Sequence, residues 1–184
     1  MNSDLERHIG KFYGKYAGSV VSNADATKTG ILSVNVPAIF GPTLPVDARP
    51  CFAFGQFFVP ADGAKVWVEF EGGDTDCPIW TGIYYPADKV PTEAQADPPV
   101  NRVIQTPSGH TVQLNDDDNP AIVIRHKDDS FVAIDKDGSV VISNKNGSNI
   151  YLNAKGEELS ITSQHGHTIA MNGDTLTQAG TSWA

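Results

Sequence analysis

The sequence predicts an all-β protein with two parts, a compact aromatic-rich domain followed by a long repetitive β-structure. Seventeen glycines and twelve prolines among 184 residues indicate many turns. Short segments alternate apolar and polar residues with the period of two that is typical of strands. Most of the aromatic residues lie in the first half of the chain, whereas pairs of aliphatic residues recur through the second. These differences predict two units with different architectures.

The first unit, residues 14–86, is predicted to be a small β-domain of about five strands. Residues 32–36 and 66–70 alternate apolar and polar side chains, and apolar stretches occupy residues 51–54 and 79–85. Glycine-rich turns separate these segments, and the aromatic side chains are large enough to fill a core. The pattern is typical of a closed barrel or a small sandwich.

The remaining segments complete the expected organisation. Residues 1–13 are predicted to form an N-terminal arm, and residues 87–100, rich in proline and without periodicity, a linker. Residues 101–184 then form the second unit. No apolar segment follows a basic start, so no signal peptide is expected. Cys51 and Cys77 are therefore expected to be free, buried thiols.

The second unit contains a repeat of aliphatic residues at positions i and i+2, which share one face of a strand. Successive pairs start roughly 8 to 10 residues apart, with turn-forming residues between them. The segments 109–115 and 166–172 are also similar to each other. The pairs are Val112/Leu114, Ile122/Ile124, Val132/Ile134, Val140/Ile142, Ile150/Leu152, Leu159/Ile161 and Ile169/Met171.

Two architectures can accommodate this repeat. Short strands at such a spacing are typical of a sandwich or barrel made by one chain. However, one narrow aliphatic stripe per strand, with few aromatic residues, makes a thin core for a single chain. Three copies wound around one axis would bury every stripe and leave no open sheet edges. We therefore predict a homotrimer with the fourteen paired residues as its core.

Charge and motifs exclude several classes of function. The formal net charge of −9 argues against a nucleic-acid partner, since phosphate binding needs clustered Lys and Arg. No nucleophile motif, phosphate-binding loop or dinucleotide fingerprint occurs. Glu157 and Glu158 are adjacent, so on a strand they would point to opposite faces rather than act as a catalytic pair. We expect that the protein is not an enzyme.

Several segments together resemble the phage baseplate assembly protein V and Vgr spike family. The most specific is FVPADGAKVWVEFEGGD at residues 58–74, and GKYAGSVVSNAD at residues 14–25 also resembles the opening strand of that family. Further similar segments are residues 30–37, 78–82 and 106–116, so that the resemblance extends over most of the chain.

The resemblance implies an OB-fold barrel followed by an intertwined trimeric β-helix, the needle. Such a protein is the central spike of a contractile tail, located in the virion baseplate and assembled in the host cytoplasm. Its barrel would dock on the hub protein at the end of the tail tube, and its needle would pierce the outer membrane of the target cell. Some relatives insert a lysozyme domain, for which residues 87–100 leave no room. The residues do not distinguish a phage tail from a tailocin or a secretion apparatus.

A second class of function uses the barrel as a ligand-binding module. OB-folds bind oligosaccharides or oligonucleotides, and Tyr16, Phe52, Phe54 and Trp67 could form a stacking platform. The repeat would then be an oligomerisation stalk. The scarcity of Lys and Arg around these aromatic residues favours a core or a docking surface instead.

His165 and His167 are the candidate metal ligands. Counting back in steps of two from Met171 and Ile169 places both histidines on the inward face of the needle. Three chains would then bring six imidazoles to the axis, which suits an octahedral first-row ion such as Fe²⁺ better than zinc. Short spikes of the resembling family carry a similar His-x-His element with an axial iron. We therefore predict one iron ion, or another first-row metal, per trimer; alternatively, both histidines are exposed turn residues around Gly166.

Other polar clusters are expected to be structural. His110 and His126 are single histidines in register with aliphatic pairs, so they are predicted to be packed or hydrogen-bonded. Residues 116–118 and 135–138 are rich in aspartate but lack the remaining ligands of a calcium loop, so they are predicted to be turns.

Overall fold

The computed structural model describes residues 6–117 and 120–180 and is all-β apart from short helical turns. The chain divides into two compact units, Met1–Lys89 and Val90–Ala184. The first five residues of the expected arm and the last four of the expected needle lie outside the described residues, as does Asp118. No helix in the described part of the chain is long and apolar enough to cross a membrane.

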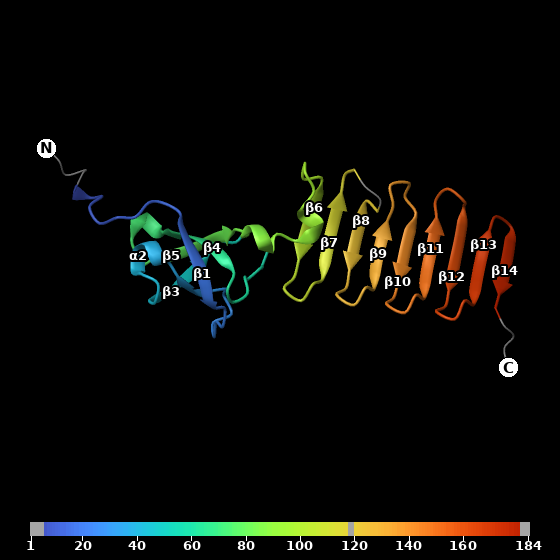
Figure 1. Ribbon diagram of the computed structural model, residues 1–184, viewed down its shortest axis with the longest axis horizontal. Helices are drawn as coiled ribbons and strands as arrows, with labels where there is room; N and C mark the ends of the chain where they lie inside the picture. Colours follow the sequence, from blue (N-terminus) through green and yellow to red (C-terminus); the bar gives the residue numbers. More distant parts are fainter. Residues whose placement is uncertain (1–5, 118–119, 181–184) are drawn as a thin grey trace. The chain divides into compact units, whose positions relative to one another are not determined.

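The first unit is a closed barrel of five strands (Figure 1). Its strands follow the order β1-β2-β3-β5-β4, and β1 closes the barrel by pairing with β4. All pairs are antiparallel except that of β3 with β5. The strands are β1 (Tyr16–Ser22), β2 (Leu32–Asn35), β3 (Pro45–Pro50), β4 (Lys65–Phe70) and β5 (Pro78–Ile83), with α2 (Pro37–Phe40) after β2 and η1 (Glu71–Gly73) after β4.

Alternation along β2 and β4 creates the core of the barrel, as the sequence predicts. The side chains of Leu32, Val34, Val36, Val66 and Val68 are fully buried. They come from alternate positions because successive side chains of a strand point to opposite faces. The expectation of a strand at residues 51–54 was wrong: β3 ends at the preceding proline, and these residues form the start of a loop.

A polar loop between β1 and β2 is organised by one carboxylate. The Thr27 hydroxyl donates a hydrogen bond to Asp25 Oδ1 at 2.6 Å, and the N–H groups of Thr29, Gly30 and Ile31 donate to Oδ2 at 2.8, 2.9 and 3.1 Å. These donors favour the ionised carboxylate, so the hydroxyl of Thr27 and the backbone N–H groups hold the pKa of Asp25 well below its usual value.

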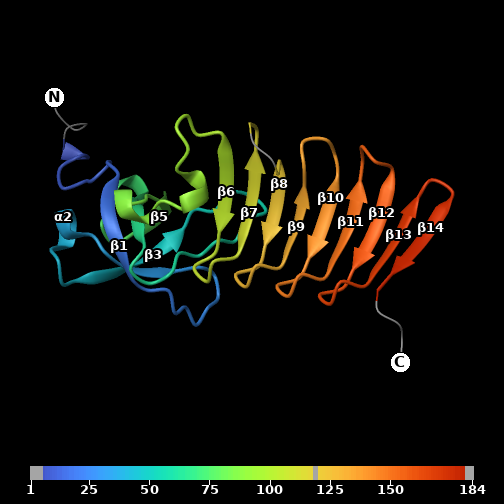
Figure 2. The same ribbon diagram turned by 45° about the vertical axis from the view of Figure 1, so that its right-hand side comes forward.

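The second unit is one antiparallel sheet in which every strand pairs with its neighbours in the chain (Figures 1 and 2). Residues 87–100, expected as a linker, contain the short helices η2 (Ala87–Lys89) and η3 (Thr92–Ala94). The nine strands are β6 (Asn101–Gln105), β7 (Thr111–Asn115), β8 (Ile122–Arg125), β9 (Phe131–Ile134), β10 (Val140–Ser143), β11 (Asn149–Asn153), β12 (Glu158–Thr162), β13 (Thr168–Asn172) and β14 (Thr175–Ala179).

Turns along one edge of this sheet share a five-residue pattern. The first residue donates its N–H to the carbonyl oxygen of the fifth, and its side chain accepts an N–H from within the turn. The fourth residue has a left-handed φ, which favours glycine. The turns are Thr106–His110, His126–Ser130, Asn144–Ser148 and Ser163–His167.

Successive turns on this edge are also joined to one another. The fifth residue of one turn accepts the N–H of the second residue of the next. His110 Nδ1 accepts from Lys127 at 3.3 Å, and Ser148 Oγ accepts from Gln164 at 2.9 Å. Ser130 Oγ accepts from Lys145 at 3.0 Å in the same way. These bonds stiffen the edge beyond the ladder of the strands.

Candidate functional site

The fourteen aliphatic side chains predicted for the trimer core lie on one face of the β6–β14 sheet, which we call the aliphatic face. Together with Ile104 and Leu176, they form two rows in which residues of neighbouring strands are directly opposed. One row is Ile104, Val112, Ile124, Val132, Ile142, Ile150, Ile161 and Ile169; the other is Leu114, Ile122, Ile134, Val140, Leu152, Leu159, Met171 and Leu176.

Ile104 and Leu176 extend the two rows and were missed by the sequence pattern. Each has a polar residue at the other position of its doublet, Arg102 and Gln178 respectively. A search for two aliphatic residues at i and i+2 therefore passes over β6 and β14. The register with β7 and β13 shows that both belong to the face.

The aliphatic face is open in the single chain. Most of the fourteen side chains are exposed, from 36% at Val112 to 53% at Ile124. On the opposite face, Val123 is only 3% exposed and Ala133 is also buried. Contiguous exposed apolar surface of this extent marks a surface that another molecule covers.

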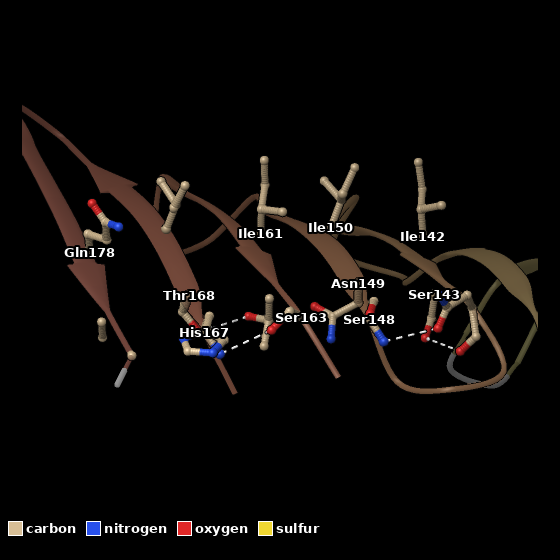
Figure 3. A pocket seen from close by; sticks show the side chains of 15 residues that line it. Ile142, Ser143, Ser148, Asn149, Ile150, Ile161, Ser163, His167, Thr168 and Gln178 are labelled. Carbon is tan, nitrogen blue, oxygen red and sulfur yellow. Dashed lines mark hydrogen bonds between the residues drawn. The ribbon is translucent and has the colours of Figure 1, made fainter. Parts of the chain in front are cut away.

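A pocket of about 710 Å³ lies along one aliphatic row and the neighbouring turns, and Ile142, Ile150, Ile161 and Ile169 are among its lining residues. Figure 3 shows Ile142, Ile150 and Ile161 pointing to one side of the sheet. Ser148 and Ser163 from the neighbouring turns also line the pocket, and Figure 3 shows them on the other side of the strands from the isoleucines.

The two candidate metal ligands lie in the last described turn of this edge. His167 donates its N–H to Ser163 Oγ at 3.2 Å, and His165 Nε2 lies 3.1 Å from the amide nitrogen of Gln164. The strand alternation begins only at Thr168, so counting in steps of two from β13 does not extend to His165. In Figure 3, His167 lies beside Ser163 and Thr168, away from the isoleucines.

One chain by itself does not build a metal centre within the described residues, where no group of three or more His, Cys, Asp or Glu side chains could hold an ion. The predicted site draws one pair of histidines from each of three chains, so it stays a prediction. Its geometry would require the turn around Gly166 to direct the imidazoles toward the other copies.

The other two histidines of the sheet are hydrogen-bonded. The rings of His110 and His126 pack at a tilt, with centroids 4.5 Å apart. His110 Nδ1 accepts from Lys127, and His126 Nδ1 accepts from the N–H of Asp128 at 3.2 Å. Both histidines therefore hold backbone turns.

The aspartate-rich segment around Asp135 forms a turn. Asp135 Oδ1 accepts the N–H groups of Ser139 and Asp137 at 2.8 and 2.9 Å. The N–H of Ser139, followed by that of Asp137, lowers the pKa of Asp135. The carboxylate is thus used within its own turn.

The barrel also carries an apolar surface. The loop Cys51–Pro60, which we call the aromatic loop, contains no charged residue. Its base is anchored by Phe52, whose ring packs 5.1 Å from that of Trp80. Phe54 at its tip is fully exposed, and Phe57 and Phe58 are mostly exposed.

The four aromatic residues considered as a stacking platform do not share one surface. Tyr16 and Phe52 pack against the barrel core. Trp67 packs at a tilt against Tyr84 with centroids 4.8 Å apart. Of the four, only Phe54 projects freely. This arrangement favours core packing and docking over an aromatic binding platform.

The two cysteines are free, but the expectation that they are buried was wrong, because both are exposed. The parallel pairing of β3 with β5 sets Arg49 opposite Ile79. Cys51 and Cys77 are therefore offset by four residues along the strands, or about 13 Å at 3.3 Å per residue. A disulfide spans a much shorter Cα distance, so the two cannot pair within one chain.

The first unit is thus a closed five-stranded barrel, and the second is a sheet with an open aliphatic face. Residues 16–85 match the model of the type VI secretion system/phage-baseplate injector OB domain family. The barrel belongs to this phage baseplate assembly protein V and Vgr-type family, which confirms the resemblance found in the sequence. The match covers the barrel and not the β6–β14 sheet, and supports a structural role in a baseplate. No curated protein matches the chain.

Proposed function

We propose that this protein is the central spike of a contractile injection machine. Three copies cover one another's aliphatic faces to form a needle, which pierces the outer membrane of the target cell. The barrel docks the needle on the hub protein at the end of the tail tube. The observation that carries this proposal is the pair of aliphatic rows, continuous from β7 to β13 and open to solvent in one chain.

Burial of these rows supplies the energy for assembly. Covering a half-exposed aliphatic side chain contributes about 1 kcal/mol, and most of the fourteen paired side chains of each copy are exposed. The face is only two residues wide, so it suits a narrow core around an axis better than a broad sandwich. Three copies agree with the trimeric needle of the family that the sequence resembles.

The continuous hydrogen bonding between neighbouring strands and turns of the sheet supports a mechanical role. Each strand pairs with both chain neighbours from β7 to β13, and the turns on one edge are joined to each other. Proline, which lacks the N–H that a ladder needs, does not occur after Pro120. A ladder without such interruptions resists bending when the needle is driven forward.

The aromatic loop is the proposed contact with the hub. Its tip exposes Phe54, Phe57 and Phe58 on an acidic chain, yet the loop itself carries no charge. Exposed aromatic side chains of this kind are typical anchors in protein interfaces. Docking there leaves the aliphatic faces free for the needle.

A metal centre at the histidine turn is a separate part of the proposal. Six imidazoles from His165 and His167 of three copies would hold one iron or other first-row ion and cross-link the chains. The cross-link would act where the sheet approaches its last described strand. The trimer does not depend on this centre, since the aliphatic rows extend well beyond it.

The oligomeric state tests the proposal directly. Multi-angle light scattering on the full chain should give three chain masses. Ile150→Asp places a charge on the aliphatic face and should reduce the mass toward that of one chain. Asn149→Asp places the same charge on the opposite face of the same strand and should leave the trimer intact. A folded wild-type monomer would overturn the proposal.

A further inference from the structure

The aliphatic rows end at polar side chains. In the row that contains Ile150 and Ile161, the residue opposite Ile169 on the last described strand is Gln178. Figure 3 shows Gln178 on the same side of the sheet as these isoleucines. At the other end of the sheet, Arg102 lies opposite Leu114 and pairs with Asp116.

The polar side chains at the two ends of the sheet differ in their hydrogen-bond partners. The guanidinium of Arg102 has the Asp116 carboxylate and the carbonyl oxygen of Val100 as partners within the chain. In contrast, the carboxamide of Gln178 makes no hydrogen bond to any other described residue. In the single chain Gln178 is exposed to water. In a three-copy needle that covers the row, the amide needs a partner from another copy, because a buried unpaired amide is costly.

We propose that the Gln178 side chains of three copies meet on the axis of the needle and hydrogen-bond to one another in a ring that closes the apolar core. This inference rests on the proposed three-copy needle. A carboxamide carries both donors and an acceptor. Each Gln178 can therefore donate an N–H to the amide oxygen of Gln178 in the next copy. The third copy donates to the first, which closes the ring.

Such a ring fixes the register of the three chains. If one copy slips along the axis, its Gln178 faces an aliphatic residue such as Ile169 or Ile161 of another copy. The amide then loses its partner, which disfavours the slipped alignment. A single polar layer in an otherwise apolar core selects one alignment by the same principle in helical oligomers.

Cysteine cross-linking tests whether the three positions converge. In the full chain carrying Cys51→Ser and Cys77→Ser, Gln178→Cys should form a disulfide between two of the three copies on mild oxidation. Thr177→Cys, on the opposite face of β14, is the matched control and should remain unlinked. A trimer by light scattering in which Gln178→Cys does not cross-link, or in which Thr177→Cys links equally, overturns the inference.

A negative charge at position 178 gives a second test, measured by the melting temperature. Gln178→Glu should bring three carboxylates together, so its melting temperature should fall below that of the wild type at pH 7. The difference should shrink near pH 4, where the carboxyls become protonated. Thr177→Glu should show a smaller difference with little change between these pH values. Equal behaviour of the two variants contradicts the ring, whereas a wild-type monomer contradicts the proposed function itself.

Discussion

The indole N–H of Trp80 donates a hydrogen bond to the carbonyl oxygen of Gly30 at 3.0 Å inside the barrel. This bond ties β5 to the loop that Asp25 organises. The ring of Phe52 packs against both Trp80 and Gly30. The base of the aromatic loop is therefore connected to the β1–β2 loop through the barrel core.

Replacing Trp80 by Phe should destabilise the barrel by about 1–3 kcal/mol, because it leaves the buried carbonyl of Gly30 without its donor. Chemical denaturation followed by circular dichroism measures the change. Trp67→Phe is the control, since Trp67 lies at the surface against Tyr84 and donates no hydrogen bond to another described residue. A similar loss in both variants would contradict the role of the Trp80 bond.

Gly30→Ala should destabilise the barrel by more than Gly55→Ala. Both glycines have a left-handed φ, 90° and 78°, so each substitution costs about 1–2 kcal/mol in backbone strain. A Cβ at Gly30 would also lie 2.8 Å from the Phe52 ring, whereas nothing lies within 4 Å at Gly55. Thermal melts of the two variants measure the difference, and equal melting temperatures would show that the Phe52 contact does not matter.

Asp25→Asn should lower the melting temperature at neutral pH, because the amide cannot accept all the donors that the carboxylate holds. The pKa of Asp25 is lowered in the folded state, so its contribution is present above the unfolded value of about 3.9 and is lost as the pH falls below it. The difference from wild type should therefore diminish on acidification below about pH 4. Asp47→Asn, an exposed change of the same charge, is the control.

Metal content tests the proposed histidine centre. The purified wild-type trimer should contain one iron or other first-row ion per three chains by elemental analysis, and a strong chelator should lower the melting temperature of the needle. His165→Ala combined with His167→Ala should abolish binding. His110→Ala, which alters a hydrogen-bonded turn instead, should retain the ion. A trimer without stoichiometric metal would remove this centre and leave the aliphatic core in place.

The sequence predicted the membership of the aliphatic face with few omissions. All fourteen paired residues lie in two rows because alternation along a strand is a local property. Ile104 and Leu176 escaped because their doublets include Arg102 and Gln178. The histidine pair shows the limit of counting in steps of two. His165 and His167 precede the first residue of β13, so the turn and not the strand sets the direction of His167.

Local patterning in this chain thus determined the all-β class, the change of architecture between the two units and the face on which the aliphatic residues gather. The tertiary structure decided the closure of the barrel, the separation of Cys51 from Cys77, the projection of Phe54 and the alignment of Gln178 with Ile169. These features depend on which strands pair and in which register. Such pairings join residues distant in the sequence, whereas a period of two specifies only how each strand presents its own side chains.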